Sequence, residues 1–321
     1  MTKKIIFALA VFLASCTSNK ALKHPLDKSK SKTVVLENGL KVYLLSDPSF
    51  NVSAASVSVE VGSLDNPDDR QGLAHFLEHM LFLGTEKYPD VDEYSSYLKT
   101  YGGYSNAYTA SDHTNYQFQV LPDGFEGALD RFSQFFISPL FTEEYTAREV
   151  NAVNSEHQKN MLNDNWRQFR VSSLFAKEGH PERKFGTGNL ETLGDITREE
   201  LIRFYKQHYS ANRMGVALLS THTLEEMEAW CRQYFSSIKN HNLDRNKYDP
   251  GFLEKKETFR FIQIDPVKDV RNLNLLFSLP ATRHLYKSKP GRQFGFILGY
   301  EGKGSLLSYL KQKGWALSLS A

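Results

Sequence analysis

Residues 71–89 read "QGLAHFLEHMLFLGTEKYP", and this stretch decides how the rest of the sequence is interpreted. Apolar residues recur at helical spacing from Leu73 onward, which predicts an amphipathic helix. On such a helix His75 and His79 differ by about 400° of rotation, so they project from one face, one turn apart. Glu78 lies near the same rim. An otherwise apolar helix therefore carries three ionisable groups on adjacent turns, a pattern typical of a metal site.

The spacing of these three residues suits a catalytic zinc site. Neutral imidazoles that converge on one ion are good zinc ligands, and a catalytic zinc takes three protein ligands and a water. A glutamate beside the metal, but not bound to it, can accept the proton of that water and then protonate the leaving amine. The order His-x-x-Glu-His is the inverzincin signature. A structural interpretation, two hydrogen-bonded histidines on a half-buried helix, stays open until a third ligand is found.

The best candidates for the third ligand lie in "EYTAREVNAVNSEHQKN", residues 144–160. Glu149 and Glu156 are seven residues apart, so on a helix they share one face at a separation of two turns. A long helix that crosses the first could bring Glu156 to the ion and orient Glu149 towards a ligand histidine. The alternative interpretation is a solvated helix surface, which composition alone favours.

Several further blocks of sequence resemble one known family. They are "HFLEHMLFLGTEKYP", a glutamate 77 residues after His79, "GGYSNAYTASDHTNYQF", "NDNWRQFRVSSLF" and "KFGTGNLETL". With these blocks the chain resembles the pitrilysin and insulin-degrading enzyme family of zinc metallopeptidases (insulinases) from about Val34 to its last residue. Family members of this type are much longer, so the resemblance is to their N-terminal portion.

The resemblance implies a role for each residue of the candidate site. It implies one zinc ion per chain with ligands His75, His79 and Glu156, a general base Glu78, and a glutamate, Glu149, that orients a ligand histidine. The stretch "SNAYT" matches the strand that pairs with the substrate backbone in the family, so Asn106 and Ala107 are expected to contact a peptide. An exposed edge strand holds an extended peptide by main-chain hydrogen bonds, which tolerates many peptide sequences.

The order of predicted elements indicates the fold class. An Asn-Gly turn in "TVVLENGLKVYLLSD" separates two strands, and the alternation in "VSAASVSVEVGSL" predicts another. The stretch "YGGYSNAYTASDHTNYQFQV" predicts two strands, helices dominate from about 124 to 179, and 199–238 predicts helix, strand and helix. Strands interleaved with runs of helices favour an α+β domain. With the resemblance, we expect a mixed, mainly antiparallel sheet packed by helices (LuxS/MPP-like), and an incomplete second domain of the same type.

The first 16 residues predict export. "MTKK" supplies a positive start, "IIFALAVFLAS" is an apolar stretch too short to span a bilayer, and "LASC" places small residues before Cys16. This pattern resembles a bacterial lipoprotein signal. We therefore expect a lipid anchor on Cys16 and a location on the periplasmic side of the outer membrane or at the cell surface. An ordinary secretory signal is the alternative. Cys231 is the second of two cysteines, so no internal disulfide is expected after processing.

The predicted organisation has five segments. They are a signal peptide (1–16), a polar tether (17–32), a catalytic domain (33–240), a linker (241–257) and the start of a truncated second domain (258–321) that opens with a strand pair in "FIQIDPVKDVRNLNLLFSLPA". A net charge of +2 argues against a nucleic-acid partner. In the family the second half supplies substrate-binding residues, so we expect a peptidase that needs a C-terminal half or partner subunit for full activity on peptide substrates. A non-catalytic peptide-binding or assembly subunit that keeps the metal site, and an inactive fragment, are the alternatives.

Four other features are expected to be structural. His113 suits a hydrogen bond at a strand end, His157 points away from the proposed ion, and Cys231 suits a buried thiol. The glycines of "KFGTG" at residues 184–188 lack the preceding strand and following helix of a phosphate-binding loop. They are expected to lie in a loop that packs near the metal domain.

Overall fold

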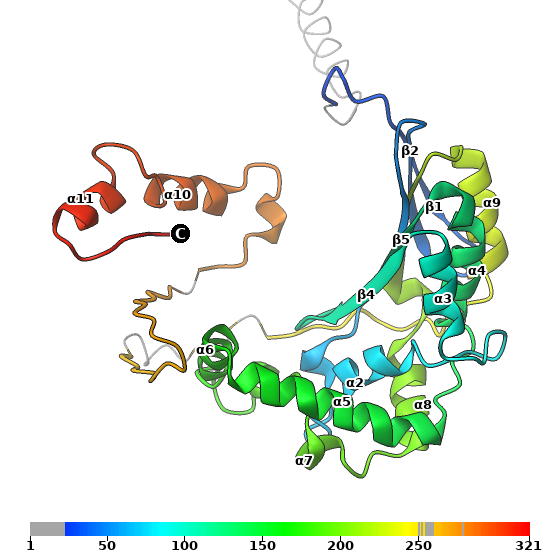
Figure 1. The fold of residues 1–321 in the computed structure, drawn as a ribbon, viewed down its shortest axis with the longest axis horizontal. Coiled ribbons are helices and arrows are strands. Elements are labelled where there is room, and N and C mark those ends of the chain that lie inside the picture. Colours follow the sequence, from blue (N-terminus) through cyan, green and yellow to red (C-terminus); the bar gives the residue numbers. More distant parts are fainter. Residues whose placement is uncertain (1–22, 250, 252, 254–259, 278) are drawn as a thin grey trace, which may run out of the picture. The chain divides into compact units, whose positions relative to one another are not determined.

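The computed structural model describes residues 23–249, 251, 253, 260–277 and 279–321 (Figure 1). The chain divides into two compact units. The first comprises the chain up to Arg170 together with Lys184–Asn246, and the second comprises Val171–Arg183 together with Lys247–Ala321. The predicted signal peptide and Cys16 lie outside the described residues. Among the helices of the described part, none is long and apolar enough to cross a membrane.

The first unit is built on one six-stranded sheet. Its strands are β1 (Lys30–Val35), β2 (Lys41–Ser46), β3 (Ser53–Val59), β4 (Tyr104–Thr109), β5 (Thr114–Val120) and β6 (Met214–Ser220). They lie in the order β1-β2-β6-β3-β5-β4, and only the β2–β6 pair is parallel. The mixed, mainly antiparallel sheet expected from the sequence is confirmed. Strand β4 forms one edge of this sheet.

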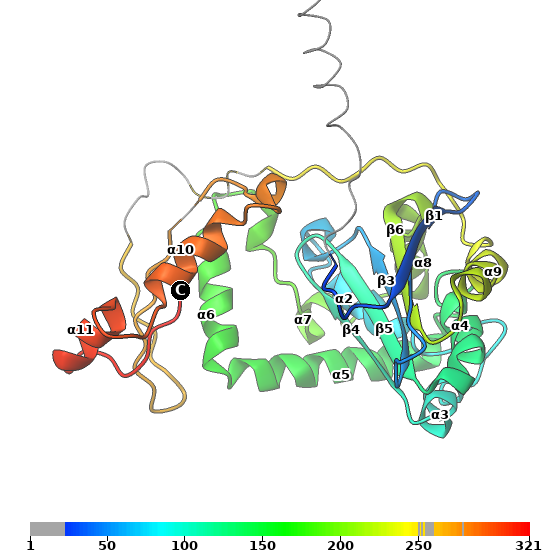
Figure 2. The same ribbon diagram turned by 90° about the horizontal axis from the view of Figure 1, so that it is seen from above.

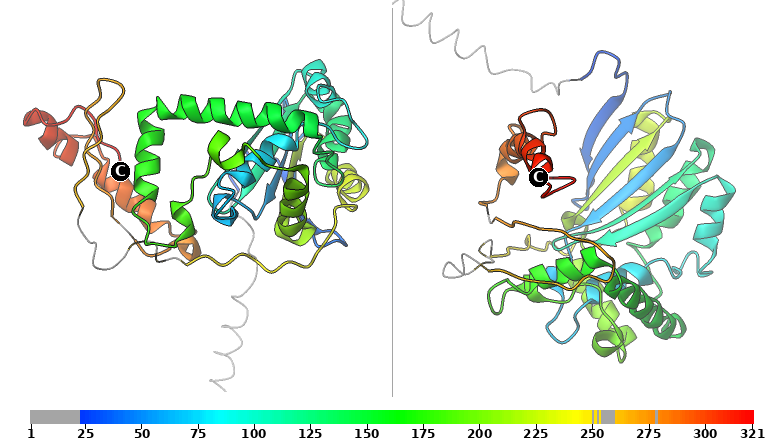
Figure 3. Two further views of the ribbon diagram at one scale, coloured as in Figure 1. Left: turned by 90° about the horizontal axis from the view of Figure 1, so that it is seen from below. Right: turned by 60° about the vertical axis from the view of Figure 1, so that its left-hand side comes forward.

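Helices cover one face of the sheet (Figure 3). Along β3 every second residue is buried, from Ser53 through Val57 to Val59, while the residues between are half-buried. This alternation follows from the two-residue period of a strand, which sends successive side chains to opposite faces. The buried face carries the core and the other face stays accessible to solvent.

The longer helices of the first unit lie in the ranges where the sequence predicted helices, and short helices join them. They are η1 (Ser63–Asp65), α2 (Leu73–Met80), α3 (Glu93–Thr100), η2 (Pro122–Gly124), α4 (Phe125–Gln134), α5 (Glu143–Met161), α7 (Leu190–Leu193), α8 (Arg198–His208), η4 (Ala211–Arg213) and α9 (Leu224–Phe235). Helix α6 (Asp164–Ser173) begins in the first unit and ends in the second. Side chains of Asn189, Thr197 and Thr223 accept backbone hydrogen bonds at the starts of α7, α8 and α9, which satisfies N–H groups that a helix leaves unpaired.

Aromatic side chains dominate the core beneath the sheet. Phe132 is fully buried and its ring lies 5.1 Å from Phe118 and 5.5 Å from Phe136, in both cases edge to face. Tyr116 is also fully buried, and its hydroxyl lies 2.6 Å from that of Tyr209. The polar end of each tyrosine is therefore satisfied inside an apolar layer. Removing one such ring costs about 3–5 kcal/mol of the free energy of unfolding.

The second unit contains η3 (Pro181–Arg183), η5 (Arg283–Leu285), α10 (Pro290–Leu298) and α11 (Leu306–Gln312). The strand pair predicted over 261–281 is wrong, because no described residue of that range lies in a strand. Leu273 and Leu276 are instead 80% and 75% exposed. The described residues of this range therefore neither pair with a strand nor contribute to the buried core.

One predicted boundary differs from the structure. Strand β1 begins at Lys30, so the last residues of the predicted tether belong to the sheet. Backbone pairing of β1 with β2, from Lys30 opposite Ser46, has no side-chain signature and explains the difference. The bounds of the catalytic domain, 33–240, stay a prediction; within them, Val171–Arg183 groups with the second unit.

Candidate metal centre

Helix α2 carries the His-x-x-Glu-His stretch, and its first turn is held by specific backbone contacts. Gly72 precedes the helix with a φ of 94°, in the left-handed region that favours glycine. A Cβ atom on Gly72 would lie 2.3 Å from the Cα of Gly188, so the loop around Gly188 packs directly on this position. The side-chain oxygen of Asn66 accepts a hydrogen bond from the backbone N–H of Ala74 at 2.8 Å. The start of α2 is thereby fixed.

The two histidines are oriented through their Nδ1 atoms. Nδ1 of His75 lies 2.8 Å from the carbonyl oxygen of Thr187, and since a carbonyl only accepts, Nδ1 is the donor. Nδ1 of His79 lies 3.4 Å from Oε2 of Glu149. In both rings these contacts leave the lone pair of Nε2 available for a metal ion.

The third candidate ligand comes from α5, which contacts α2 and appears as a long, straight helix in Figure 2. Oε2 of Glu156 lies 3.6 Å from Nε2 of His75 and 3.7 Å from Nε2 of His79. Glu149, two turns earlier on α5, contacts His79 from the other side of its ring. One face of α5 therefore presents both glutamates to α2.

The geometry of these three side chains fits a zinc ion. Ligand atoms of His75, His79 and Glu156 lie within 4.8 Å of one another. Tetrahedral zinc with bonds of about 2.0–2.2 Å requires ligand atoms roughly 3.3–3.6 Å apart, close to the distances from Glu156 to both imidazoles. Two imidazoles and one carboxylate are a donor set that zinc prefers, with a fourth position left open. In the described part of the chain no other group of three or more metal-binding side chains is found.

Charges and burial shift the pKa values of the two imidazoles in opposite directions. Burial lowers the pKa of His75, and the neighbouring His79 lowers it further, which favours the neutral imidazole that binds metals. Burial alone would lower the pKa of His79, but the hydrogen bond to Glu149 and the nearby carboxylates raise it overall. The His79 hydrogen bond lowers the pKa of Glu149, which stays ionised. Bound zinc would replace the proton as the positive charge among these carboxylates.

Glu78 stands apart from the ligand set. It is only 6% exposed, and its Oε2 accepts a hydrogen bond of 2.6 Å from the hydroxyl of Thr109. Burial raises the pKa of Glu78 to about 7, although the Thr109 hydrogen bond and His79 act in the opposite direction. A carboxyl group with a pKa near neutrality exchanges protons readily, as a general base and acid must.

The residues predicted to contact a peptide lie on β4. Asn106 is exposed, whereas Ala107 is half-buried against the core. On the accessible face of the sheet, beside this edge, lies a cavity of about 340 Å³. Tyr104 of β4 and Tyr43 of β2 line it together with small residues such as Ala54 and Ala217, and no charged side chain lines it.

The other residues singled out in the sequence lie outside the ligand set. At the turn between β4 and β5, Nδ1 of His113 is 2.8 Å from Asp112 and Nε2 is 3.3 Å from the hydroxyl of Tyr108. The ring of His157 lies 4.9 Å from that of Phe185. Cys231 is fully buried in α9, and burial raises the pKa of its thiol to about 12.

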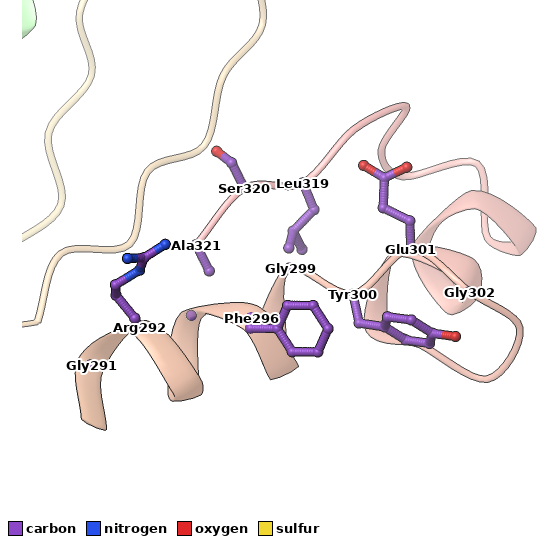
Figure 4. Close-up of a pocket in the computed structure, with 11 residues that line it drawn as sticks. Gly291, Arg292, Phe296, Gly299, Tyr300, Glu301, Gly302, Leu319, Ser320 and Ala321 are labelled. Carbon is purple, nitrogen blue, oxygen red and sulfur yellow. The ribbon is translucent and has the colours of Figure 1, made fainter. Parts of the chain in front are cut away.

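A second cavity, of about 770 Å³, lies within the second unit (Figure 4). Helix α10, the loop that follows it and the last three residues of the chain form its walls. Its charged lining residues are Arg292 and Glu301, and no histidine or cysteine contributes to it. It therefore does not resemble a metal centre.

Comparisons with known proteins identify the family of this chain. The sequence profile "Insulinase (Peptidase family M16)" matches residues 41–178, and the profile "Peptidase M16 inactive domain" matches residues 195–321. The chain belongs to the insulinase family, peptidase family M16. The chain is 44% identical to human insulin-degrading enzyme over 308 residues, covering 94% of this chain and 30% of that protein. It is 43% identical over 307 residues to the A-factor-processing enzyme of Saccharomyces cerevisiae, with shares of 94% and 30%.

The fold of this insulinase-family chain is also that of a solved relative. The crystal structure of pitrilysin superimposes with a TM-score of 0.82 at 29% identity, covering 95% of this chain and 33% of that one. The family resemblance found in the sequence is thus confirmed. The chain spans about a third of the length of the curated relatives that it matches.

Two contributions to the insulinase-type site were missed by reasoning from the sequence. The hydroxyl of Thr109 contacts Glu78, and the backbone carbonyl of Thr187 contacts His75. A carbonyl acceptor has no side-chain signature, although Thr187 lies within the glycine-containing "KFGTG" stretch already noted. Thr109 ends the "SNAYT" stretch, which was considered only for its backbone.

Proposed function

We propose that this chain is the catalytic portion of a zinc-dependent endopeptidase. The observation that carries the proposal is the convergence of His75, His79 and Glu156, whose ligand atoms lie within 4.8 Å of one another, beside the buried Glu78. Membership of the insulinase family supports peptide hydrolysis as the reaction. One ion per chain would be held by these two imidazoles and one carboxylate.

Each residue around the ion has a separate role in the proposed hydrolysis. Zinc held by His75, His79 and Glu156 would supply a Lewis acid for the scissile carbonyl and for the attacking water. Glu78 accepts the proton of that water and then delivers it to the leaving amine. Glu149 holds His79 in the tautomer that presents Nε2, and the Thr187 carbonyl does the same for His75.

Strand β4 is the proposed place for the peptide. It is an edge strand whose last residue, Thr109, contacts the proposed base. A peptide in extended conformation that pairs with β4 near Asn106 and Ala107 would be held through its backbone and carried towards Glu78. Unfolded peptides are therefore the proposed substrates, since a folded chain does not offer a free extended segment.

Full activity is proposed to need additional polypeptide, either a C-terminal half or a partner subunit. The chain spans about a third of the length of its relatives, and apolar side chains of the second unit such as Leu273 and Phe277 are largely exposed. A peptide-binding or assembly subunit that keeps its metal site is the second candidate, which the uncharged cavity of about 340 Å³ beside β4 supports. We further propose export and a lipid anchor on Cys16, which the apolar stretch and "LASC" support.

The proposal is tested by zinc content and peptide cleavage. The purified chain and its Glu78→Gln and Glu156→Gln variants are assayed for bound zinc and for cleavage of a quenched fluorescent peptide, with Glu144→Gln as the control on α5. We expect about one zinc per chain in all but Glu156→Gln, and cleavage only by the wild type and the control. Zinc without cleavage favours the non-catalytic subunit, or the need for a further half if adding one restores activity. A folded wild-type chain without stoichiometric zinc contradicts the site.

A further inference from the structure

Thr109 donates a hydrogen bond to the proposed general base, Glu78. It is the last residue of β4, and its hydroxyl lies 2.6 Å from Oε2 of Glu78. Because Glu78 sits on α2, this hydrogen bond joins the edge strand of the sheet to the helix that carries both histidines. A hydrogen bond of this length to a carboxylate belongs to the strong class.

The direction of this hydrogen bond follows from its neighbours. A threonine hydroxyl has a single proton to donate. The other nearby acceptor for Thr109 is the hydroxyl of Thr114, which lies farther away, at 3.4 Å. Thr114 is fully buried and donates its own proton to the carbonyl oxygen of Val61 at 2.8 Å. Thr114 can then only accept from Thr109, but the Glu78 carboxylate lies closer, at 2.6 Å against 3.4 Å, and carries the negative charge, so the Thr109 proton is directed to Glu78.

The turn that follows Thr109 is held in place. The backbone N–H groups of Ser63 and Leu64 donate to the carbonyl oxygens of Ala110 and Ser111 at 2.9 and 3.0 Å. A Cβ atom on Gly62 would lie 2.4 Å from each of these two carbonyl oxygens, so the approach requires glycine there. The end of β4 is thus fixed against η1, and Thr109 has little freedom to follow Glu78 if the carboxylate rotates.

The contact distinguishes the two oxygens of Glu78. Oε2 accepts the Thr109 proton, whereas no hydrogen bond to Oε1 is found among the described residues. A carboxylate fixed through one oxygen keeps the other in a defined direction. In the proposed reaction Oε1 is then the atom that receives the proton of the attacking water.

We propose that Thr109 is a positioning residue, which fixes the Glu78 carboxylate through Oε2, leaves Oε1 for proton transfer and couples the base to edge strand β4. This inference rests on the proposed peptidase function. Since β4 is also the proposed peptide-binding strand, the strand that holds the peptide also holds the base. Thr109 lies two residues after Ala107 on β4. If a bound peptide shifts β4, the hydrogen bond from Thr109 shifts the Glu78 carboxylate with it.

Isosteric substitutions of Thr109 test the inference. Thr109→Val keeps the shape and the strand preference but removes the hydroxyl, and Thr109→Ser restores the hydroxyl. Thr100→Val is the control, because its exposed hydroxyl only donates to the carbonyl of Ser96 within α3. We expect Thr109→Val to lower kcat about 10- to 100-fold, with KM and zinc content within twofold of the wild type. Thr109→Ser should recover kcat to within about threefold, and Thr100→Val should match the wild type. Equal kcat for Thr109→Val and Thr109→Ser overturns the inference.

Crystal structures test whether Thr109 positions the Glu78 carboxylate even if the chain has no turnover on its own. Structures of the zinc-loaded wild type, Thr109→Val and Thr109→Ser are compared at the Glu78 carboxylate. We expect one ordered conformer in the wild type and in Thr109→Ser, and a rotated or doubled conformer in Thr109→Val. An unchanged carboxylate in Thr109→Val overturns the positioning role. Absence of cleavage by the wild type and by Thr109→Ser even after a C-terminal half is added, together with the expected carboxylate positions, counts instead against the proposed function.

Discussion

Nδ1 of His79 lies 3.4 Å from Oε2 of Glu149, while Nε2 of the same ring faces Glu156 at 3.7 Å. Both glutamates belong to α5 and are seven residues apart, so one helix face supplies a candidate ligand and the group that orients another. The site therefore depends on how α5 lies against α2, and less on either helix alone.

Replacement of Glu149 should weaken zinc binding without abolishing it. Glu149→Gln removes the negative charge that stabilises the Nδ1–H tautomer of His79, so we expect zinc affinity to fall about 10- to 100-fold. Competition with a chromophoric chelator measures the affinity. Glu144→Gln, an exposed position on the first turn of the same helix, should stay within twofold of the wild type. An affinity for Glu149→Gln equal to that of this control would show that Glu149 does not support the ligand.

Zinc should stabilise the folded chain by mass action. At a free zinc concentration 100 times the Kd, binding contributes about 2.7 kcal/mol, which raises Tm by roughly 5–10 °C for a unit of this size. Scanning fluorimetry with and without zinc measures the shift. His75→Ala should lose the shift, whereas His241→Ala, which replaces an exposed histidine, should keep it. A shift that survives in His75→Ala would place the stabilising ion elsewhere.

Local patterns in the sequence predicted most of the first unit. The predicted Asn-Gly turn before β2 is present in the structure, and Gly39 in this turn has a φ of 83°, which glycine tolerates. Alternation predicted β3, and helical spacing from Leu73 predicted α2. Turn residues, strand alternation and helical spacing each depend on residues only a few positions apart, so one sequence is enough to detect them.

Contacts between distant segments could not be predicted from these local sequence patterns. The crossing of α2 and α5 was expected only as a possibility until the family resemblance supplied it. The carbonyl of Thr187, 112 residues from His75, gives no signal because every residue has one. The strand pair over 261–281 was predicted as the start of the second domain, but a strand needs a neighbouring strand to pair with, and its own residues do not specify that neighbour.

Cys231 should be chemically inert in the folded chain. Burial raises its pKa to about 12, so the thiol is protonated at pH 8 and only about 10⁻⁴ of it is the reactive thiolate. In a Cys16→Ser background, where Cys231 is the remaining thiol, we expect alkylation by iodoacetamide to be at least about 100-fold slower than after unfolding in urea. Ser236→Cys, at the exposed end of α9, adds a matched thiol that should react quickly. Comparable rates for the two cysteines in the folded chain would contradict the burial of Cys231.

The contact between Gly72 and Gly188 should be intolerant of a single methyl group. In Gly72→Ala the new Cβ would lie 2.3 Å from the Cα of Gly188, and the φ of 94° disfavours any side chain. We expect a loss of about 2–4 kcal/mol in the free energy of unfolding, measured in urea. Zinc affinity should fall as well, because the displaced loop carries the Thr187 carbonyl that orients His75. Gly186→Ala lies in the same loop, where the nearest atom is the Ser63 Cβ at 3.2 Å, and it should cost less than about 1 kcal/mol. If both variants lose the same stability and zinc affinity, the close approach of Gly72 to Gly188 is not what fixes the start of α2.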